Sequence, residues 1–256
     1  MNINEVKKRI PSFYKNIEYY DNLDSTNTLI KNGNYHHGDI IIADSQNKGR
    51  GRNGKTFHSP AGKGIYFSFL INPQLNINEA LKITALVSVS LVKAIQKNYH
   101  ISPQIKWVND LIINDKKIAG ILCESTLKSN YKDIDKMIIG IGINVHSYNM
   151  PDDLKDSAGC IEDFTNIKIS RQKIIIDFLN IFYDDYLNLS SSNFMHDYRQ
   201  YSYILDQHIN VYENNHCYEA YVQSINDDGT LTIITNNQTQ ILQSGEISIR
   251  KIKENT

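Results

Sequence analysis

The chain has few cysteines, a single tryptophan and almost no net charge. Its 256 residues include three cysteines, and 27 Lys+Arg nearly balance 28 Asp+Glu for a formal net charge of −1. Cys123, Cys160 and Cys217 form no C-x-x-C pair, so we expect neither a disulfide framework nor a zinc site. A near-neutral chain lacks the positive field of a dedicated nucleic-acid binder, so we expect no nucleic acid as the main partner.

Long apolar runs and a secretory signal are also missing. The longest apolar stretch, near Ile83–Ile95, is interrupted by polar residues, and the first twenty residues contain no apolar core of a signal peptide. We therefore expect no membrane span and a cytoplasmic location. Hydrophobic residues at 41% and charged residues at 21% are typical of a globular core rather than of a disordered chain.

Along the chain, patterns typical of strands alternate with patterns typical of helices. Apolar residues at helical spacing predict helices, and β-branched runs bounded by polar turns predict strands. A polar stretch from Asp44 to Gly64, punctuated by glycine, predicts a long loop. The expected helices are Thr28–Asn32, Glu79–Tyr99 and Ser170–Leu189, and the expected strands are Asp39–Ala43, Ile65–Ile71, Gln104–Val108, Leu111–Ile113, Ile118–Ser125 and Met137–Val145.

The pattern changes after Leu205. Short alternating strands follow, separated by turn signals such as Asp228-Gly229 and Asn236-Asn237. We therefore expect a larger domain over residues 1–205 and a small antiparallel β domain over residues 206–256. No low-complexity linker separates the two, so we expect them to pack closely.

A glycine-rich segment, Gly49–Gly54 (GRGRNG), formally matches the G-x-G-x-x-G pattern. A dinucleotide fingerprint must open a helix, and the following residues, KTFHSP, cannot start one. What remains is a loop whose glycines let backbone amides approach a ligand, with Arg50 and Arg52 suited to phosphate or carboxylate recognition. A solvated basic turn is the alternative.

Two further segments carry candidate chemistry. The first consists of KWVND at Lys106–Asp110 and KKIAG at Lys116–Gly120, which bracket a tight hairpin and bring cations near a carboxylate; an ordinary hairpin with a charged rim is the alternative. The second is GIGIN, in which Gly140 and Gly142 lie within a strand. Glycine there indicates close approach of a ligand or of another part of the protein, and the sequence leaves both open.

Taken together and in order, these segments resemble biotin–protein ligases: DSTN at Asp24–Asn27, Gln46, GRGRNG, KWVND, KKIAG and GIGIN. The resemblance covers about residues 20–250. It implies an α+β catalytic domain, a mixed β-sheet packed with helices and similar to class II aminoacyl-tRNA synthetase cores, followed by a small SH3-like β-barrel. It also implies two reactions: biotin and ATP with Mg²⁺ give biotinyl-5′-AMP, and a lysine of a biotin carboxyl carrier protein domain then takes the biotin.

The resemblance implies a role for each motif residue. Joining a carboxylate to a triphosphate brings anions together, so cations are needed to stabilise the developing charge. Asp110 would orient or deprotonate the acceptor lysine, which is protonated at neutral pH when free. Mg²⁺ would come with the ATP phosphates, and no residue is assigned to it. The catalytic candidates are Arg50, Arg52, Lys106, Asp110 and Lys117. The biotin-binding candidates are Ser25, Thr26, Asn27, Gln46, Arg50, Gly51, Arg52, Phe57, Lys117, Gly120 and Gly140. The ATP-binding candidates are Arg50, Arg52, Lys106, Asn109, Lys117, Gly142, Asn144 and Arg250.

Two departures from the family pattern stand out. Val108 occupies a position where the family usually has proline, which loosens the backbone before Asn109. No aromatic residue that would cover the adenine is evident around Ala158–Phe164. Because the glycine loop is expected to close over the adenylate, replacing Arg52 with glycine should release the intermediate and label proteins indiscriminately.

Alternatives remain beside the biotin ligase reading. A lipoate or octanoate ligase shares the superfamily fold, and a non-catalytic biotin-binding protein would share the pocket. A biotin-sensing repressor would carry a three-helix DNA-binding module, and the 23 residues before Asp24 are too few for one, so no repressor function is expected. The carrier would belong to an acetyl-CoA or pyruvate carboxylase. A homodimer is left open, because relatives dimerise to different extents.

Overall fold

The structure, a computed structural model of the chain, describes residues 1–191, 193–213, 216–243 and, for the backbone alone, 248–251. Seven strands form a mixed sheet in the order β1-β2-β3-β7-β6-β5-β4. Only β1 and β2 pair in parallel, and every other neighbouring pair is antiparallel. The strands are β1 (Ile17–Leu23), β2 (Ile40–Gln46), β3 (Gly64–Ile71), β4 (Gln104–Lys106), β5 (Asp110–Ile113), β6 (Lys116–Leu127) and β7 (Ile134–Asn144).

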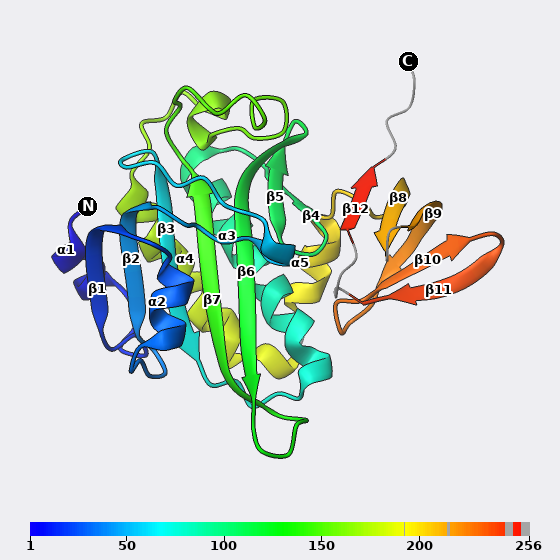
Figure 1. Cartoon of the computed structure of the whole chain (residues 1–256), viewed down its shortest axis with the longest axis horizontal. Helices are drawn as coiled ribbons and strands as arrows, with labels where there is room; N and C mark the ends of the chain where they lie inside the picture. The colour runs from blue at the N-terminus through cyan, green and yellow to red at the C-terminus, as the bar shows by residue number, and fades with distance from the viewer. Residues whose placement is uncertain (192, 214–215, 244–247, 252–256) are drawn as a thin grey trace.

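Helices cover both faces of this sheet, as Figure 1 shows. The long helices α3 (Ala80–Tyr99) and α4 (Arg171–Leu187) lie on one face, and the short α2 (Thr26–Asn32) lies on the other. Successive strand residues point to opposite faces, so neighbours in sequence enter different cores. On β2, Ile41 packs with Ile30 of α2, whereas Ile40 packs in the larger core with α3 and α4. A central strand covered on both faces is fully buried, as β3 is along its whole length.

The remaining short elements lie in the segments that precede or connect these strands and helices. They are α1 (Ile3–Arg9), α5 (Phe194–Gln200), η1 (Arg52–Gly54), η2 (Ile77–Glu79), η3 (Ile161–Phe164) and η4 (Leu189–Ser191). Within the described part of the chain, no helix has both the length and the apolar character that crossing a bilayer requires.

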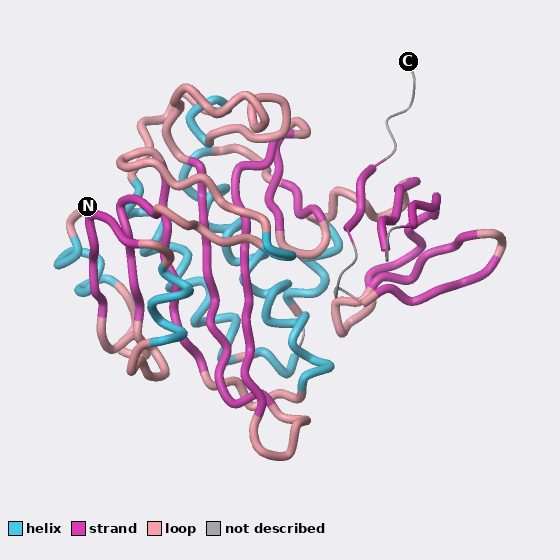
Figure 2. Tube along the Cα trace, viewed as in Figure 1, coloured by secondary structure: helices cyan, strands magenta, loops and turns pink. Residues whose placement is uncertain are grey.

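A second, smaller sheet is built from the C-terminal strands and projects beside α5 (Figure 2). It is antiparallel throughout, in the order β11-β10-β9-β8-β12. It is tied to the larger part by hydrogen bonds: the Trp107 indole N–H donates to Gly229 O at 2.9 Å, and Arg199 Nε donates to Ile225 O at 2.8 Å. The strands are β8 (His208–Glu213), β9 (His216–Ile225), β10 (Leu231–Thr235), β11 (Gln238–Leu242) and β12 (Ser248–Lys251).

The expected α+β class, a mixed sheet packed with helices and followed by a small antiparallel sheet, is confirmed. Several boundaries were wrong. The helix expected from Thr28 begins at Thr26, because Ser25 caps it. The long loop expected from Asp44 begins after Gln46, because β2 continues that far beside β1. Strand β1 was missed because it is an edge strand that buries only Ile17, which leaves no alternating apolar pattern to detect.

Candidate active site

A cavity of about 610 Å³ opens at the face of the large sheet, between the start of α2, the glycine loop and strands β5, β6 and β7. The motifs that are scattered along the sequence meet here. Arg250 lies in β12, and its side chain is outside the described residues. The predicted site residues that line the cavity are Ser25, Thr26, Asn27, Gln46, Arg50, Gly51, Arg52, Phe57, Lys106, Asn109, Asp110, Lys117, Gly120, Gly140, Gly142 and Asn144.

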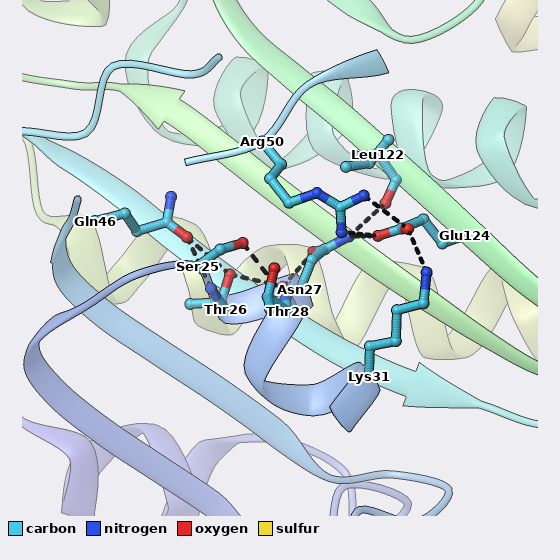
Figure 3. A network of polar contacts seen from close by, with 10 residues as sticks. Ser25, Thr26, Asn27, Thr28, Lys31, Gln46, Arg50, Leu122 and Glu124 are labelled. Carbon is cyan, nitrogen blue, oxygen red and sulfur yellow. Dashed lines mark hydrogen bonds and ion pairs between the residues drawn. The ribbon is translucent and has the colours of Figure 1, made fainter. Parts of the chain in front are cut away.

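At one wall, the first turn of α2 holds a fixed array of polar groups (Figure 3). The backbone N–H of Thr26 donates to Gln46 Oε1 at 2.9 Å, and its hydroxyl lies 3.2 Å from the same oxygen. Gln46 Nε2 in turn donates to Ser59 Oγ at 2.9 Å. These bonds fix which end of the Gln46 amide faces α2, so the array presents a set pattern of donors and acceptors to a ligand.

Asn27 lies beside this array but is held by the protein itself. Its side chain Nδ2 donates to Glu124 Oε2 at 3.1 Å, and Ser68 Oγ lies 2.5 Å from its Oδ1. Gly140 on β7 makes room for it, since a Cβ there would lie 1.9 Å from Asn27 Oδ1. Asn27 therefore lines the cavity with its amide already bonded within the protein.

Two glycines near one end of the β6–β7 ladder leave space above the sheet. Gly120 and Gly142 face each other in register. A Cβ at Gly142 would lie 2.6 Å from the Phe57 ring, and one at Gly120 would lie 3.1 Å from Lys117 Nζ. The sequence left open whether Gly142 makes room for a ligand or for another part of the protein. In the structure it makes room for the protein, because the missing side chain lets Phe57 lie against the strand as part of the cavity wall.

Cationic groups gather at the hairpin of β5 and β6. Lys117 Nζ forms an ion pair with Asp110 Oδ1 at 2.7 Å, and Lys106 lies opposite Asp110 in the backbone register of the β4–β5 ladder. Arg52 reaches across from the glycine loop, and its Nη1 donates to Asn109 Oδ1 at 3.4 Å. The peptide bond between Trp107 and Val108, where the family usually has proline, is cis.

Charge at this hairpin favours an anionic ligand. Burial lowers the pKa of Arg52, opposed by the nearby charge of Asp110, and a guanidinium stays protonated in such surroundings. Among the described residues that line the cavity, Asp110 is the only carboxylate, whereas lysine and arginine appear five times. The excess of positive charge fits a bound carboxylate or phosphate.

Arg50 is placed differently from the other cations. Its guanidinium makes a bidentate pair with Glu124, with Nη1 at 2.9 Å from Oε2 and Nη2 at 3.0 Å from Oε1 (Figure 3). Glu124 was missed in the sequence. The signal that would have drawn attention to it is a carboxylate in the middle of the strand that begins with KKIAG, because a partly buried carboxylate needs partners.

The sequence also missed an aromatic pair in the cavity wall. His58 and Tyr148 stack with ring centroids 5.7 Å apart and an interplanar angle of 27°, and both line the cavity. Tyr148 lies just after β7, whereas the aromatic cover for adenine was sought around Ala158–Phe164. Ala158 lines the cavity too, so the chain reaches the site in this segment but contributes no aromatic side chain to the lining there.

The cavity does not contain a ready-made metal cage. Within the described residues, no group of three or more His, Cys, Asp or Glu side chains is arranged to hold a metal ion. One carboxylate beside several cations fits a metal that arrives on a ligand's phosphates, since Mg²⁺ is often held by one carboxylate together with substrate phosphates.

Comparison with known proteins identifies the family of the chain. Residues 19–144 match the model of the biotin/lipoate A/B protein ligase family. The bifunctional ligase/repressor BirA of Bacillus subtilis is 30% identical over 239 residues, which span 90% of this chain and 73% of that protein. The chain belongs to this ligase family.

A solved structure of a family member shares this architecture over most of the chain. The biotin protein ligase from Aquifex aeolicus, in complex with biotin and ATP, superimposes with a TM-score of 0.80 at 28% identity and covers 93% of this chain and all of that chain. A biotin–[acetyl-CoA-carboxylase] ligase from Paracoccus denitrificans is 30% identical over 107 residues, covering 41% of this chain and 43% of that protein. The family assignment therefore rests on both sequence identity and fold.

Proposed function

We propose that the chain is a biotin–protein ligase that activates biotin with ATP and transfers it to a lysine of a biotin carboxyl carrier domain. The observation that carries the proposal is the meeting, in one cavity, of a rigid polar wall at the start of α2 and a cationic hairpin at β5–β6. Biotin has a polar ureido ring at one end and a carboxylate at the other, and the two walls match these chemistries.

In the first step, an oxygen of the biotin carboxylate attacks the α-phosphorus of ATP, and pyrophosphate leaves. Lys117 and Arg52 stabilise the negative charge that builds on the phosphate oxygens, and Lys106 neutralises the outer phosphates. Mg²⁺, arriving with ATP, would screen the charge of the phosphates beside Lys106 and Lys117. Asn109 and Asn144 contact the nucleotide, and Gly142 and Arg250 are assigned to its site by their motif positions alone.

In the second step, the acceptor lysine attacks the acyl carbon of biotinyl-5′-AMP, and AMP leaves with the pair of electrons from the broken C–O bond. The amine must lose a proton to attack, and Asp110 accepts a hydrogen bond from it and takes that proton. The ion pair with Lys117 keeps Asp110 oriented toward the phosphate end of the cavity. Lys117 thus serves the first step directly and the second through Asp110.

The polar wall favours biotin over lipoate or octanoate. A dithiolane ring or an alkyl chain offers no strong hydrogen-bonding group, so it would leave unused the hydrogen-bonding capacity that Ser25 and Gln46 keep beyond their bonds within the protein. Each polar group that loses its bonds to water and gains none to the ligand costs on the order of 1–3 kcal/mol. A biotin-binding protein without catalysis would not need the cationic hairpin, so the ligase reading is also favoured over that alternative.

Several finer points belong to the same proposal. We place the domain boundary at 205/206, the carrier domain in an acetyl-CoA or pyruvate carboxylase, and the protein in the cytoplasm. The name of the relative in Paracoccus denitrificans, a biotin–[acetyl-CoA-carboxylase] ligase, supports the first of the two carboxylases. The absence of a repressor function stays a prediction from the sequence.

The deciding experiment is ATP–pyrophosphate exchange with Mg²⁺, run separately with biotin, lipoate and octanoate. Exchange that depends on biotin alone is expected. Exchange with lipoate or octanoate alone would overturn the substrate assignment while keeping the chemistry, and no exchange with any of the three would leave a binding protein.

A further inference from the structure

Glu124 lies in the middle of β6, next to the cavity, and its carboxylate is surrounded by donors from two other segments (Figure 3). Arg50 occupies both of its oxygens, at 2.9 and 3.0 Å. From α2, Asn27 Nδ2 lies at 3.1 Å and Lys31 Nζ at 3.1 Å. Its side chain is 18% exposed, so most of its charge is satisfied by these groups rather than by water.

The protonation state of this carboxylate follows from its partners. Burial alone would raise the pKa of Glu124, but the hydrogen bonds from Asn27, Arg50 and Lys31 outweigh it and lower the pKa below the ordinary range. Glu124 is therefore ionised at neutral pH, and its bonds to Arg50 are of the strong, charge-assisted kind.

Arg50 connects the glycine loop to the rest of the site. Inside the loop, Gly51 N donates to Lys55 O at 2.7 Å and Phe57 N donates to Gly49 O at 2.8 Å, so these bonds hold the loop only to itself. The bidentate pair with Glu124 spans 74 positions of sequence. It fixes the loop against β6 and, through the shared carboxylate, against α2.

We propose that Glu124 is a positioning residue for the ring end of biotin, acting through Arg50 to hold the glycine loop against the polar array of α2. The proposal rests on the function proposed above. Glu124 is absent from the residues that line the cavity, so it acts without touching the ligand. Its loss should loosen the loop near Ser25 and Thr26 while leaving the cationic hairpin of Asp110 and Lys117 in place.

The test separates the two substrates. In Glu124→Gln, one of the two hydrogen bonds from the Arg50 guanidinium loses its acceptor, because the amide NH₂ replaces a carboxylate oxygen. The KM for biotin in pyrophosphate exchange should therefore rise about tenfold. The KM for ATP should rise clearly less than the KM for biotin, because Lys106 and Lys117 lie on the hairpin and hold the phosphates even when Arg52 on the loop is displaced. Lys31→Gln is the matched control, because it removes the other cation from the same carboxylate and leaves the bidentate Arg50–Glu124 pair intact. Both KM values should then stay within about twofold of the wild type.

A double-mutant cycle with Arg50→Met shows whether Glu124 acts through Arg50. Arg50→Met alone should raise the KM for biotin about as much as Glu124→Gln does. Once Arg50 is gone, adding Glu124→Gln should change it less than about twofold. Because the Arg50 side chain is 40% exposed, this variant should fold even if a Glu124 variant does not.

Three results would overturn the proposal: an equal effect of Glu124→Gln in both backgrounds, a parallel rise of both KM values, or an Arg50→Met variant with an unchanged KM for biotin. A failure of the proposed function looks different, because the wild-type chain would then show no biotin-dependent exchange at all.

Discussion

At the residue scale, individual glycines shape the cavity by leaving room for neighbouring side chains. Gly140 faces Asn27, and Gly120 faces the end of Lys117. The two differ in what a methyl group would meet: the short amide of Asn27 is fixed by Ser68 and Glu124, whereas a lysine end can swing away. The cost of adding a methyl group should therefore differ strongly between the two glycines.

For Gly140→Ala we expect a loss of about 2–3 kcal/mol in the free energy of unfolding, because the new Cβ would lie 1.9 Å from Asn27 Oδ1. Gly120→Ala, whose Cβ would lie 3.1 Å from Lys117 Nζ, should lose less than about 1 kcal/mol. Urea unfolding of the two variants measures the difference. Equal losses would mean that Asn27 can move aside and that the wall is not rigid.

Lys117 should matter for the rate rather than for stability. Replacing it with methionine removes a cation from the phosphate end of the cavity, so the rate of pyrophosphate exchange should fall about 10²- to 10³-fold. Lys116→Met is the control, since Lys116 Nζ donates to Lys155 O on the surface and lies outside the cavity lining. A Lys117→Met enzyme within a factor of about two of the wild type would remove this lysine from the mechanism.

At the residue scale, the sequence predicted many of the side chains that line the cavity and missed some of the contacts between them. Residue spacing and the resemblance predicted which side chains would line one cavity, because the motifs consist of the residues that the proposed chemistry requires. They did not predict the Arg50–Glu124 pair or the His58–Tyr148 stack. Those partners come from separate strands and loops, so nothing local in the sequence indicates that they meet. The roles of the lining residues stay predictions.

At the scale of elements, the two long helices behind the sheet are joined by a buried carboxylate. Asp177 of α4 accepts from Lys97 Nζ at 2.8 Å and from Asn98 Nδ2 at 2.8 Å, both on α3. Asp177 is 9% exposed. Burial alone would raise the pKa of Asp177, but the bonds from Lys97 and Asn98 outweigh it and lower the pKa below the ordinary range.

A lowered pKa in the folded state means that the ionised Asp177 stabilises the fold at neutral pH. That contribution is complete above the ordinary aspartate pKa near ~3.9 and is lost as the pH falls through the lowered value. Asp177→Asn should cost about 1–2 kcal/mol of unfolding free energy at pH 7. The gap to the wild type should close as the pH falls below about 4.

Unfolding curves measured from pH 7 to pH 3 would check this. Asp152→Asn serves as the control, since Asp152 forms an exposed surface pair with Lys155 and should change stability by less than about 0.5 kcal/mol at any pH. A gap that stays constant with pH would show that the Asp177 carboxylate titrates as it does in the unfolded chain.

Elements differed in how well the sequence revealed them. Helix α3 was found nearly to the residue, because its apolar positions recur at helical spacing over 20 residues. Strand β1 and the seven-residue helix α5 were missed. A short or edge element buries too few side chains to leave a periodic pattern, so its position is decided by the tertiary packing around it.

At the scale of the whole molecule, the small C-terminal sheet docks onto the larger part through the turn at Gly229. A Cβ at Gly229 would lie 2.9 Å from Leu81 Cβ, and its φ of +87° favours glycine. The change of pattern after Leu205 predicted a separate β module but not this contact. Trp107 and Gly229 are 122 positions apart in sequence, and only the folded chain brings them together.

Gly229→Ala should lower the free energy of unfolding by about 2–3 kcal/mol. It should also raise the KM for ATP, because the displaced Gly229 carbonyl no longer holds Trp107, which is next to the ATP-binding candidate Lys106. Gly62→Ala is the control, since Gly62 also has a positive φ of +73° but open space around it. It should cost only about 1 kcal/mol and leave the KM unchanged. Identical behaviour of the two variants would show that backbone strain, and not docking, is responsible.

The indole of Trp107 gives the molecule a built-in optical reporter. It is the chain's one tryptophan, it lines the cavity, and its N–H is bonded to the neighbouring module. Its emission can therefore be followed without interference from another indole. A shift on adding ATP would read out nucleotide entry, and the same shift in Gly229→Ala would register whether the module has come loose.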